Sequence, residues 1–127
     1  MQISEERINN QVAAAETPDD INNLTIDLIP GGLIVQGDIA QRGAAPTVPL
    51  IVTTILNVEN NAIVITATNI NVGGNDAPLP VVNRINAEVV PTISDSINAA
   101  IEEEVPFIAI ESITVTDTAM TVTVTPG

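Results

Sequence analysis

The sequence predicts an α+β domain in which an antiparallel sheet packs against one long helix. Residues 21–72 and 107–126 mostly alternate apolar with polar side chains, which is the period of a strand. Between them, residues 80–104 have a helical period, with apolar residues every three or four positions. All other connections are short enough for hairpins, so the strands are expected to run antiparallel.

The whole chain, residues 1–127, is expected to form this single domain. Its length is enough to bury about two-thirds of the unfolded surface, and an apolar content of 45% is ordinary for a globular protein. Residues 1–20 are expected to form an N-terminal helix and a linker. Residues 21–127 are expected to hold the sheet and the long helix.

The first element is a short helix over residues 3–16. Ser4 is a suitable N-cap, and Glu5 and Glu6 place negative charge in the first turn, where the helix dipole favours it. The segment 17–20 (TPDD) ends the helix. One face of this helix carries its apolar residues, Ile8, Val12 and Ala15.

Four strands are then expected to form a meander, and a hairpin ends the chain. The expected strands are 24–28, 33–39, 47–58, 62–72, 107–116 and 120–125. Pro30-Gly31-Gly32 has the residues of a type II turn, and Glu59-Asn60-Asn61 those of a tight hairpin loop. Residues 73–78 are expected to be a loop rich in glycine.

The long helix is expected over residues 80–104, with a kink at Pro91, because proline lacks the amide that the helix would use there. Its C-terminal end carries Glu102, Glu103 and Glu104, which the helix dipole disfavours. Its apolar residues form two stripes, one of Val82, Ile85 and Val89 and one of Ile93, Ile97, Ala100 and Ile101.

Strict alternation makes the central hairpin apolar on both faces. On the face toward the long helix it places Val48, Leu50, Val52, Leu56, Val58, Val64, Ile70 and Val72. On the reverse face it places Ile51, Ile55, Ile63 and Ile65. Helix 3–16, a second subunit or a ligand could cover this reverse face, and the sequence leaves these alternatives open.

The chain has few side chains that could take part in catalysis. It contains no His, Cys, Lys, Trp or Tyr, and Phe107 is its one aromatic residue. Most nucleophiles, proton shuttles and soft-metal ligands are therefore missing, so neither an enzyme nor a cofactor is expected. Without cysteine there is no disulfide to indicate a redox compartment.

The charge of the chain limits its partners. Sixteen acidic residues against Arg7, Arg42 and Arg84 give a net charge of −13. A nucleic-acid partner is excluded, because it would require a basic surface, and docking on an anionic membrane through a polybasic face is excluded for the same reason. We find no run of about 18 apolar residues and no recognisable signal peptide.

Four stretches of this chain resemble the bacterial LmeA-like phospholipid-binding proteins and their relatives in the TULIP superfamily of tubular lipid-binding domains. They are INNLTIDLIPGGLIVQGDI, VPLIVTTILNVENNAIVITATNINVGG, LPVVNRINAEVVPTISDSINAAIEEEVPF and IESITVTDTAMTVTV, which together cover about residues 21–126. The resemblance implies a strongly curved antiparallel sheet that wraps the long kinked helix, with lipid in the apolar groove between them. It also implies a secreted or cell-envelope protein.

The function expected on this basis is non-enzymatic binding or carriage of a lipid or another apolar small molecule. The alternative is a structural domain that self-associates, as a homodimer or a larger assembly, with no ligand. The residues expected to line the groove are Val35, Leu50, Val52, Leu56, Val64, Ile85, Val89, Ile93, Ile97, Ile101 and Phe107.

Three weaker patterns have a more ordinary interpretation. Arg84 could hold an anionic head group, but a surface ion pair is favoured. Residues 71–76 (NVGGND) resemble a calcium loop but lack its spacing and its bidentate glutamate, so they indicate a connector. Residues 102–104 point in different directions on a helix, which favours a solvated end over a metal site.

Overall fold

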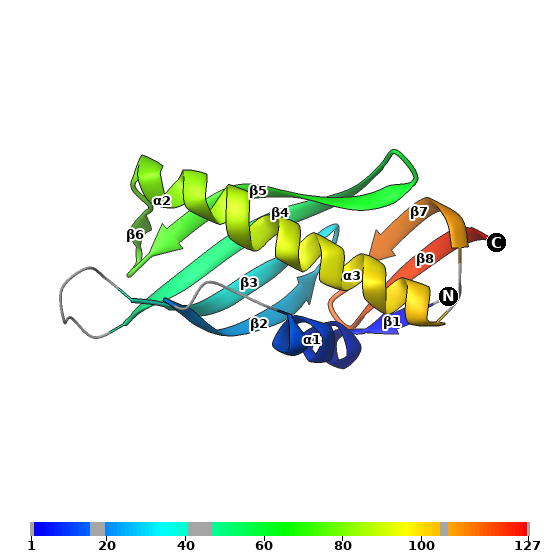
Figure 1. Cartoon of the computed structure of the whole chain (residues 1–127), viewed down its shortest axis with the longest axis horizontal. Helices are drawn as coiled ribbons and strands as arrows, with labels where there is room; N and C mark the ends of the chain where they lie inside the picture. Colours follow the sequence, from blue (N-terminus) through cyan, green and yellow to red (C-terminus); the bar gives the residue numbers. More distant parts are fainter. Residues whose placement is uncertain (1, 16–19, 41–46, 105–106, 127) are drawn as a thin grey trace.

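The computed structural model describes residues 2–15, 20–40, 47–104 and 107–126. The α+β class is confirmed: a long helix and a short N-terminal helix accompany two antiparallel sheets (Figure 1). In chain order the elements are β1 (Gln2–Ser4), α1 (Glu5–Ala14), β2 (Ile21–Ile29), β3 (Gly32–Ile39), β4 (Val48–Glu59), β5 (Ala62–Val72), β6 (Asn75–Asp76), α2 (Leu79–Arg84), a π turn (Ile85–Val89), α3 (Val90–Glu104), β7 (Phe107–Val115) and β8 (Ala119–Pro126).

The strands form two sheets, where the sequence pattern suggested one. The larger sheet has the order β2-β3-β4-β5-β6, which contains the predicted meander, and the smaller has the order β1-β8-β7. The hairpin turns of the larger sheet meet strand β7 of the smaller sheet, where Gly31 N–H donates to Val115 O (3.2 Å) and Ile110 N–H donates to Asn61 O (2.9 Å). The short strands β1 and β6 were not predicted, because two or three residues are too few to show an alternating pattern.

The predicted turns are confirmed in detail. Gly31 has a φ of 77°, the left-handed value that a type II turn requires at its third position. Asn60 and Asn61 have φ values of 51° and 65°, so the β4–β5 hairpin uses two left-handed residues. Gly32 is confined by space: a Cβ atom there would lie 2.0 Å from the Thr54 carbonyl oxygen of the neighbouring strand.

Helix α1 begins where its capping residue predicted. The Ser4 hydroxyl oxygen accepts a hydrogen bond from Arg7 N–H (3.2 Å), and Ile8 and Val12 are buried. Ile3, which was expected to belong to the helix, instead pairs with Met120 as part of β1. The strand therefore ties the start of the chain to the final hairpin.

The long helix continues through Pro91 without ending (Figure 1). Its irregularity lies one turn before the proline, where the π turn is closed by a hydrogen bond from Val90 N–H to Ile85 O. Proline lacks an amide donor and its ring crowds the carbonyl four residues earlier, and a π turn opens the helix by one residue at that position. The disruption expected at Pro91 is thus located over residues 85–89.

A β-bulge in β5 overturns the predicted face assignment of the central hairpin. Thr53 pairs with Asn69 and Thr54 with Ala67, so Thr68 is an extra residue that reverses the alternation. Ile63 and Ile65 are consequently buried on the same side as Ile70. Val64 points to the opposite face and is half-buried, so its predicted place opposite the helix is wrong.

The outer face of β4 is not covered by helix α1. Ile51 and Ile55, which the alternation placed on this face, are 39% and 45% exposed. Helix α1 packs instead against α3 and β2, beside the long helix (Figure 1). Of the covers that the sequence left open for the reverse face, helix 3–16 is therefore ruled out, because α1 joins the helical layer.

Candidate functional site

The predicted groove is filled by the side chains of the protein itself. Phe107 lies in β7, but its side chain is outside the described part of the structure. Val64 lies on the other face of its strand. The remaining predicted residues all belong to the buried core and are at most 7% exposed: Val35, Leu50, Val52, Leu56, Ile85, Val89, Ile93, Ile97 and Ile101.

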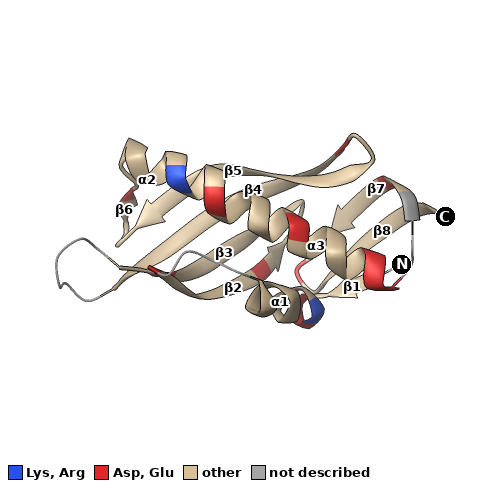
Figure 2. Ribbon diagram, viewed as in Figure 1, with Lys and Arg blue, Asp and Glu red and all other residues tan. Residues whose placement is uncertain are grey.

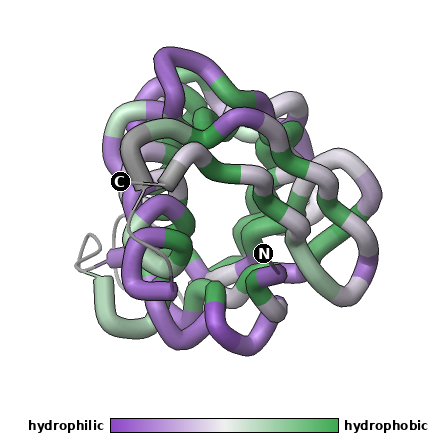
Figure 3. The backbone as a smooth tube through the Cα atoms, turned by 90° about the vertical axis from the view of Figure 1, so that its right-hand side faces the viewer, coloured by the Kyte–Doolittle hydropathy of each residue, from purple (hydrophilic) through white to green (hydrophobic). Residues whose placement is uncertain are grey.

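This core is dry. Six of these residues have no surface that a water molecule could touch, namely Leu50, Val52, Ile85, Ile93, Ile97 and Ile101. Figure 3 looks along the molecule from the end that holds β7 and β8 and shows hydrophobic positions on the segments that surround the interior. An acyl chain would have to separate the long helix from the sheet to enter this region.

The helical stripe that closes the core extends beyond it. From Ile101 back to Ile85 the buried residues follow at four-residue steps, and the next step is Val81 on α2. Val81 is only half-buried. It faces a cavity at the start of the helix. The buried core does not reach this position, whereas the apolar stripe of the helix does.

This cavity, which we call the end pocket, has a volume of about 530 Å³. That is within the range of about 300–1,000 Å³ typical of small-molecule sites. It lies where β3 ends, β5 ends and α2 begins. Its apolar lining residues are Ile39, Ala40, Val72, Pro78 and Val81, and its polar lining residues are Asp20, Asn75, Asp76 and Arg84.

The segment between β5 and α2 shapes the end pocket. Gly73 and Gly74 have φ values of 61° and 84°, so the chain reverses there and β6 pairs back on β5. Ala77 N–H then donates to Ile70 O (3.0 Å). The Pro78 carbonyl accepts from the amides of Val81 and Val82, which starts the helix over the strand ends.

An ion pair forms the polar rim of the end pocket. Both carboxylate oxygens of Asp20 accept hydrogen bonds from the two terminal nitrogens of Arg84. Arg84 Nε donates to the Glu88 carboxylate (2.7 Å), one helical turn further on. The Asp20 carbonyl also accepts from Ala40 N–H (2.7 Å), which holds this residue at the end of β3. The ion-pair interpretation of Arg84 is confirmed.

The hydrogen bonds from Arg84 stabilise the charged forms of both partners. They lower the pKa of Asp20 below its ordinary value of 3.8. The same bonds, and the bond to Glu88, raise the pKa of Arg84 above its ordinary value. Asp20 and Arg84 therefore both carry full charge near neutral pH.

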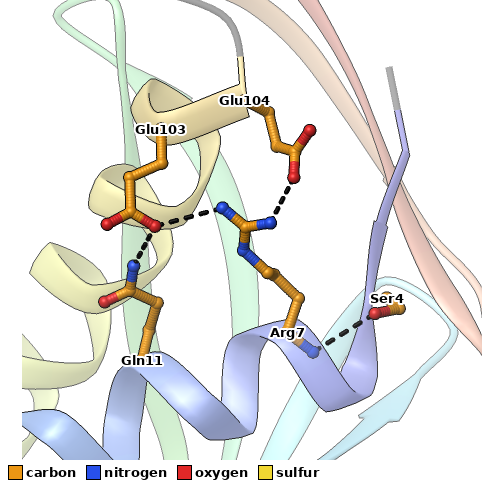
Figure 4. Close-up of polar contacts among 5 residues, drawn as sticks. All are labelled: Ser4, Arg7, Gln11, Glu103 and Glu104. Atoms are coloured by element: carbon orange, nitrogen blue, oxygen red, sulfur yellow. Dashed lines mark hydrogen bonds and ion pairs between the residues drawn. The ribbon is translucent and has the colours of Figure 1, made fainter.

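Arg7 stabilises the acidic C-terminal end of α3, which the helix dipole disfavours. The sequence alone did not identify this partner. Its guanidinium pairs with the carboxylates of Glu103 (3.1 Å) and Glu104 (Figure 4). Gln11 Nε2 donates to the same Glu103 oxygen (2.6 Å). These contacts tie α1 to the end of the long helix and have a structural role.

The described residues offer few other candidate sites. They contain no group of three or more His, Cys, Asp or Glu placed to hold a metal ion. None of the described helices combines the length and apolar character needed to cross a membrane. Four other hollows lie among the described residues. The largest of these four, about 520 Å³ beside α1, is lined largely by polar side chains, including Glu5, Asn9, Asn10, Thr25, Asp27 and Gln36.

Sequence reasoning missed most of the end pocket. It singled out Arg84 as a possible head-group contact, but it could not bring Asp20, Ile39 and Val72 together with the start of the helix. The four-residue stripe continuing from Ile85 to Val81 was the one visible signal. Comparisons with protein-family models, with curated proteins and with solved structures gave no match.

Proposed function

We propose that this protein binds an apolar small molecule, such as a lipid, without catalysing a reaction on it. The ligand's tail enters the end pocket. The observation that carries this proposal is the continuity of the apolar stripe: Val81 extends the core stripe into an open cavity of about 530 Å³. The resemblance to the tubular lipid-binding proteins supports the same function. We also propose that the sheet curves around the long helix.

The driving force would be burial of methylene groups against Ile39, Val72 and Val81. Each buried methylene contributes about 0.8 kcal/mol, which is about a fourfold gain in affinity. The gain should end once the pocket is full, because Ile85 behind it is fully buried and leaves no space. A head group would remain at the rim with Asp20 and Arg84.

Calorimetric titration with 1-octanol, 1-decanol and 1-dodecanol tests this function. We expect affinity to rise with chain length and then reach a plateau, with little dependence on salt, because the ligand is uncharged. Val81→Ser should weaken binding about tenfold. Ile51→Ser is the matched control: it removes an aliphatic side chain from the outer face of β4 and should leave binding unchanged.

Three results would contradict the proposal. They are no binding of any alcohol, affinity that does not change with chain length, or equal losses in the Val81 and Ile51 variants.

A second candidate function is self-association through the outer face of β4. The observation that favours it is the exposure of Ile51 and Ile55 on the same outward face of one strand, with Thr53 between them. Native mass spectrometry would report subunit number and any co-purified lipid together. If a dimer uses this face, Ile55→Asp should yield folded monomers, and a wild-type protein that is monomeric at all concentrations rejects this candidate.

A further inference from the structure

Arg84 is the only basic side chain that lines the end pocket in the described part of the chain, and its hydrogen-bonding capacity is largely used. A guanidinium has five N–H donors. Two terminal nitrogens donate to Asp20 and Nε donates to Glu88. Asp20 occupies the edge formed by the two terminal nitrogens, and Glu88 occupies one of the two donors of the side edge, so a ligand carboxylate or phosphate could bind bidentately only by displacing one of them.

The remaining charges at the rim are negative. Asp20 and Asp76 line the end pocket, and Glu88 is bound to Arg84 beside it. One positive group thus faces three carboxylates. Figure 2 shows the same pattern on the ribbon, where acidic positions lie on both sides of the single basic position on α2. Asp76 is exposed, and none of the ion pairs among the described residues involves its side chain.

We infer that Asp20 sets the head-group specificity of the end pocket: by holding Arg84 it excludes anionic ligands and leaves neutral or cationic amphiphiles. An anionic head group can form a bidentate pair with the terminal nitrogens of Arg84 only by displacing Asp20, which leaves a carboxylate without its partner. A hydroxyl or ammonium head group displaces nothing. This inference rests on the proposed function, since it concerns the ligand of the same pocket.

Three probes with the same tail test it: 1-decanol, decylammonium and decanoate, each titrated calorimetrically at neutral pH and low salt. Wild-type protein should bind decanol and decylammonium about tenfold or more tightly than decanoate. Asp20→Asn should tighten decanoate about tenfold, because it releases Arg84. Asp76→Asn removes the same charge from the same pocket without releasing Arg84. The increase in affinity for decanoate should therefore be clearly smaller than in Asp20→Asn.

Two double variants show which arginine is responsible for the increased affinity for decanoate. The gain in Asp20→Asn should disappear in the double variant Asp20→Asn/Arg84→Gln. Arg42 lies outside the described residues, and the gain should persist in Asp20→Asn/Arg42→Gln. A gain that depends on Arg42 would overturn the inference. Asp95→Asn, an exposed change on α3, is the remote control for net charge.

The outcomes separate the inference from the proposed function. Equal binding of all three probes by wild-type protein overturns the specificity and leaves the pocket in place. Failure of every probe to bind overturns both. If Asp20→Asn does not fold, the wild-type preference among the three probes still decides, because tighter binding of decanoate than of decanol would refute the inference without any variant.

Discussion

Asn98 on α3 pairs with the backbone of Ile63 on β5 as a neighbouring strand would. Ile63 N–H donates to Asn98 Oδ1 (3.2 Å), and Asn98 Nδ2 donates to Ile63 O (3.1 Å). At the opposite edge of the sheet, Asn9 on α1 makes the same pair with Ile26 on β2 (2.6 and 2.9 Å). The two helices thus satisfy backbone groups on the edge strand β2 and on the part of β5 that β6 does not reach, which would otherwise be open for pairing with another chain.

The first prediction concerns this edge pair. Asn98→Ala should lower the free energy of unfolding by about 1–3 kcal/mol, because it leaves the Ile63 amide without its acceptor in a part-buried place. Asn10→Ala is the matched control, since Asn10 is an exposed asparagine on a helix and should cost nothing. Urea unfolding measures both. Equal stability of the two variants would show that the pair contributes nothing.

The second prediction concerns the filled groove. Ile97→Ala should destabilise the protein by about 2–5 kcal/mol, because it opens a cavity at a fully buried position of the long helix. Ile51→Ala, on the outer face of β4, should cost less than about 1 kcal/mol. The unfolding midpoint in urea gives the comparison. An unchanged midpoint for Ile97→Ala would mean that the helix and sheet are not packed together in solution.

The third prediction tests the β-bulge at Thr68. Ile65→Asp should unfold the protein, because it places a charge in the core, whereas Val64→Asp should leave it folded on the opposite face. Circular dichroism and thermal melting distinguish the two. The reverse result would restore the strict alternation that the sequence suggested.

The fourth prediction concerns acid stability. The Arg84 hydrogen bond lowers the pKa of Asp20 below 3.8, so the folded state binds this proton less readily than the unfolded chain. The stability from Asp20 is therefore complete above about pH 4 and is lost as the pH falls through the lower, folded pKa. Asp20→Asn should show a smaller drop in Tm between pH 5 and 2 than wild type. Parallel curves for wild type and Asp20→Asn would contradict this.

Patterns that repeat over many residues were readable from the chain. The alternation in strands β2 to β5, β7 and β8, the period change before the long helix, and the Ser4 cap each depend on neighbours in the sequence. The turn at Gly31 and the hairpin at Asn60-Asn61 were readable for the same reason, because left-handed backbone restricts the residue type.

The sequence by itself determined the α+β class, the order of the main elements and the apolar stripe of the long helix, because these follow from local periodicity and turn chemistry. Only the tertiary structure decided which face of β5 is buried, since one extra residue at Thr68 reverses the alternation. It also decided that α1 lies beside α3, that Arg7 binds Glu103 and Glu104, and that Asp20 meets Arg84. These contacts join residues far apart in the chain. No local sequence pattern indicates which distant surfaces pack together.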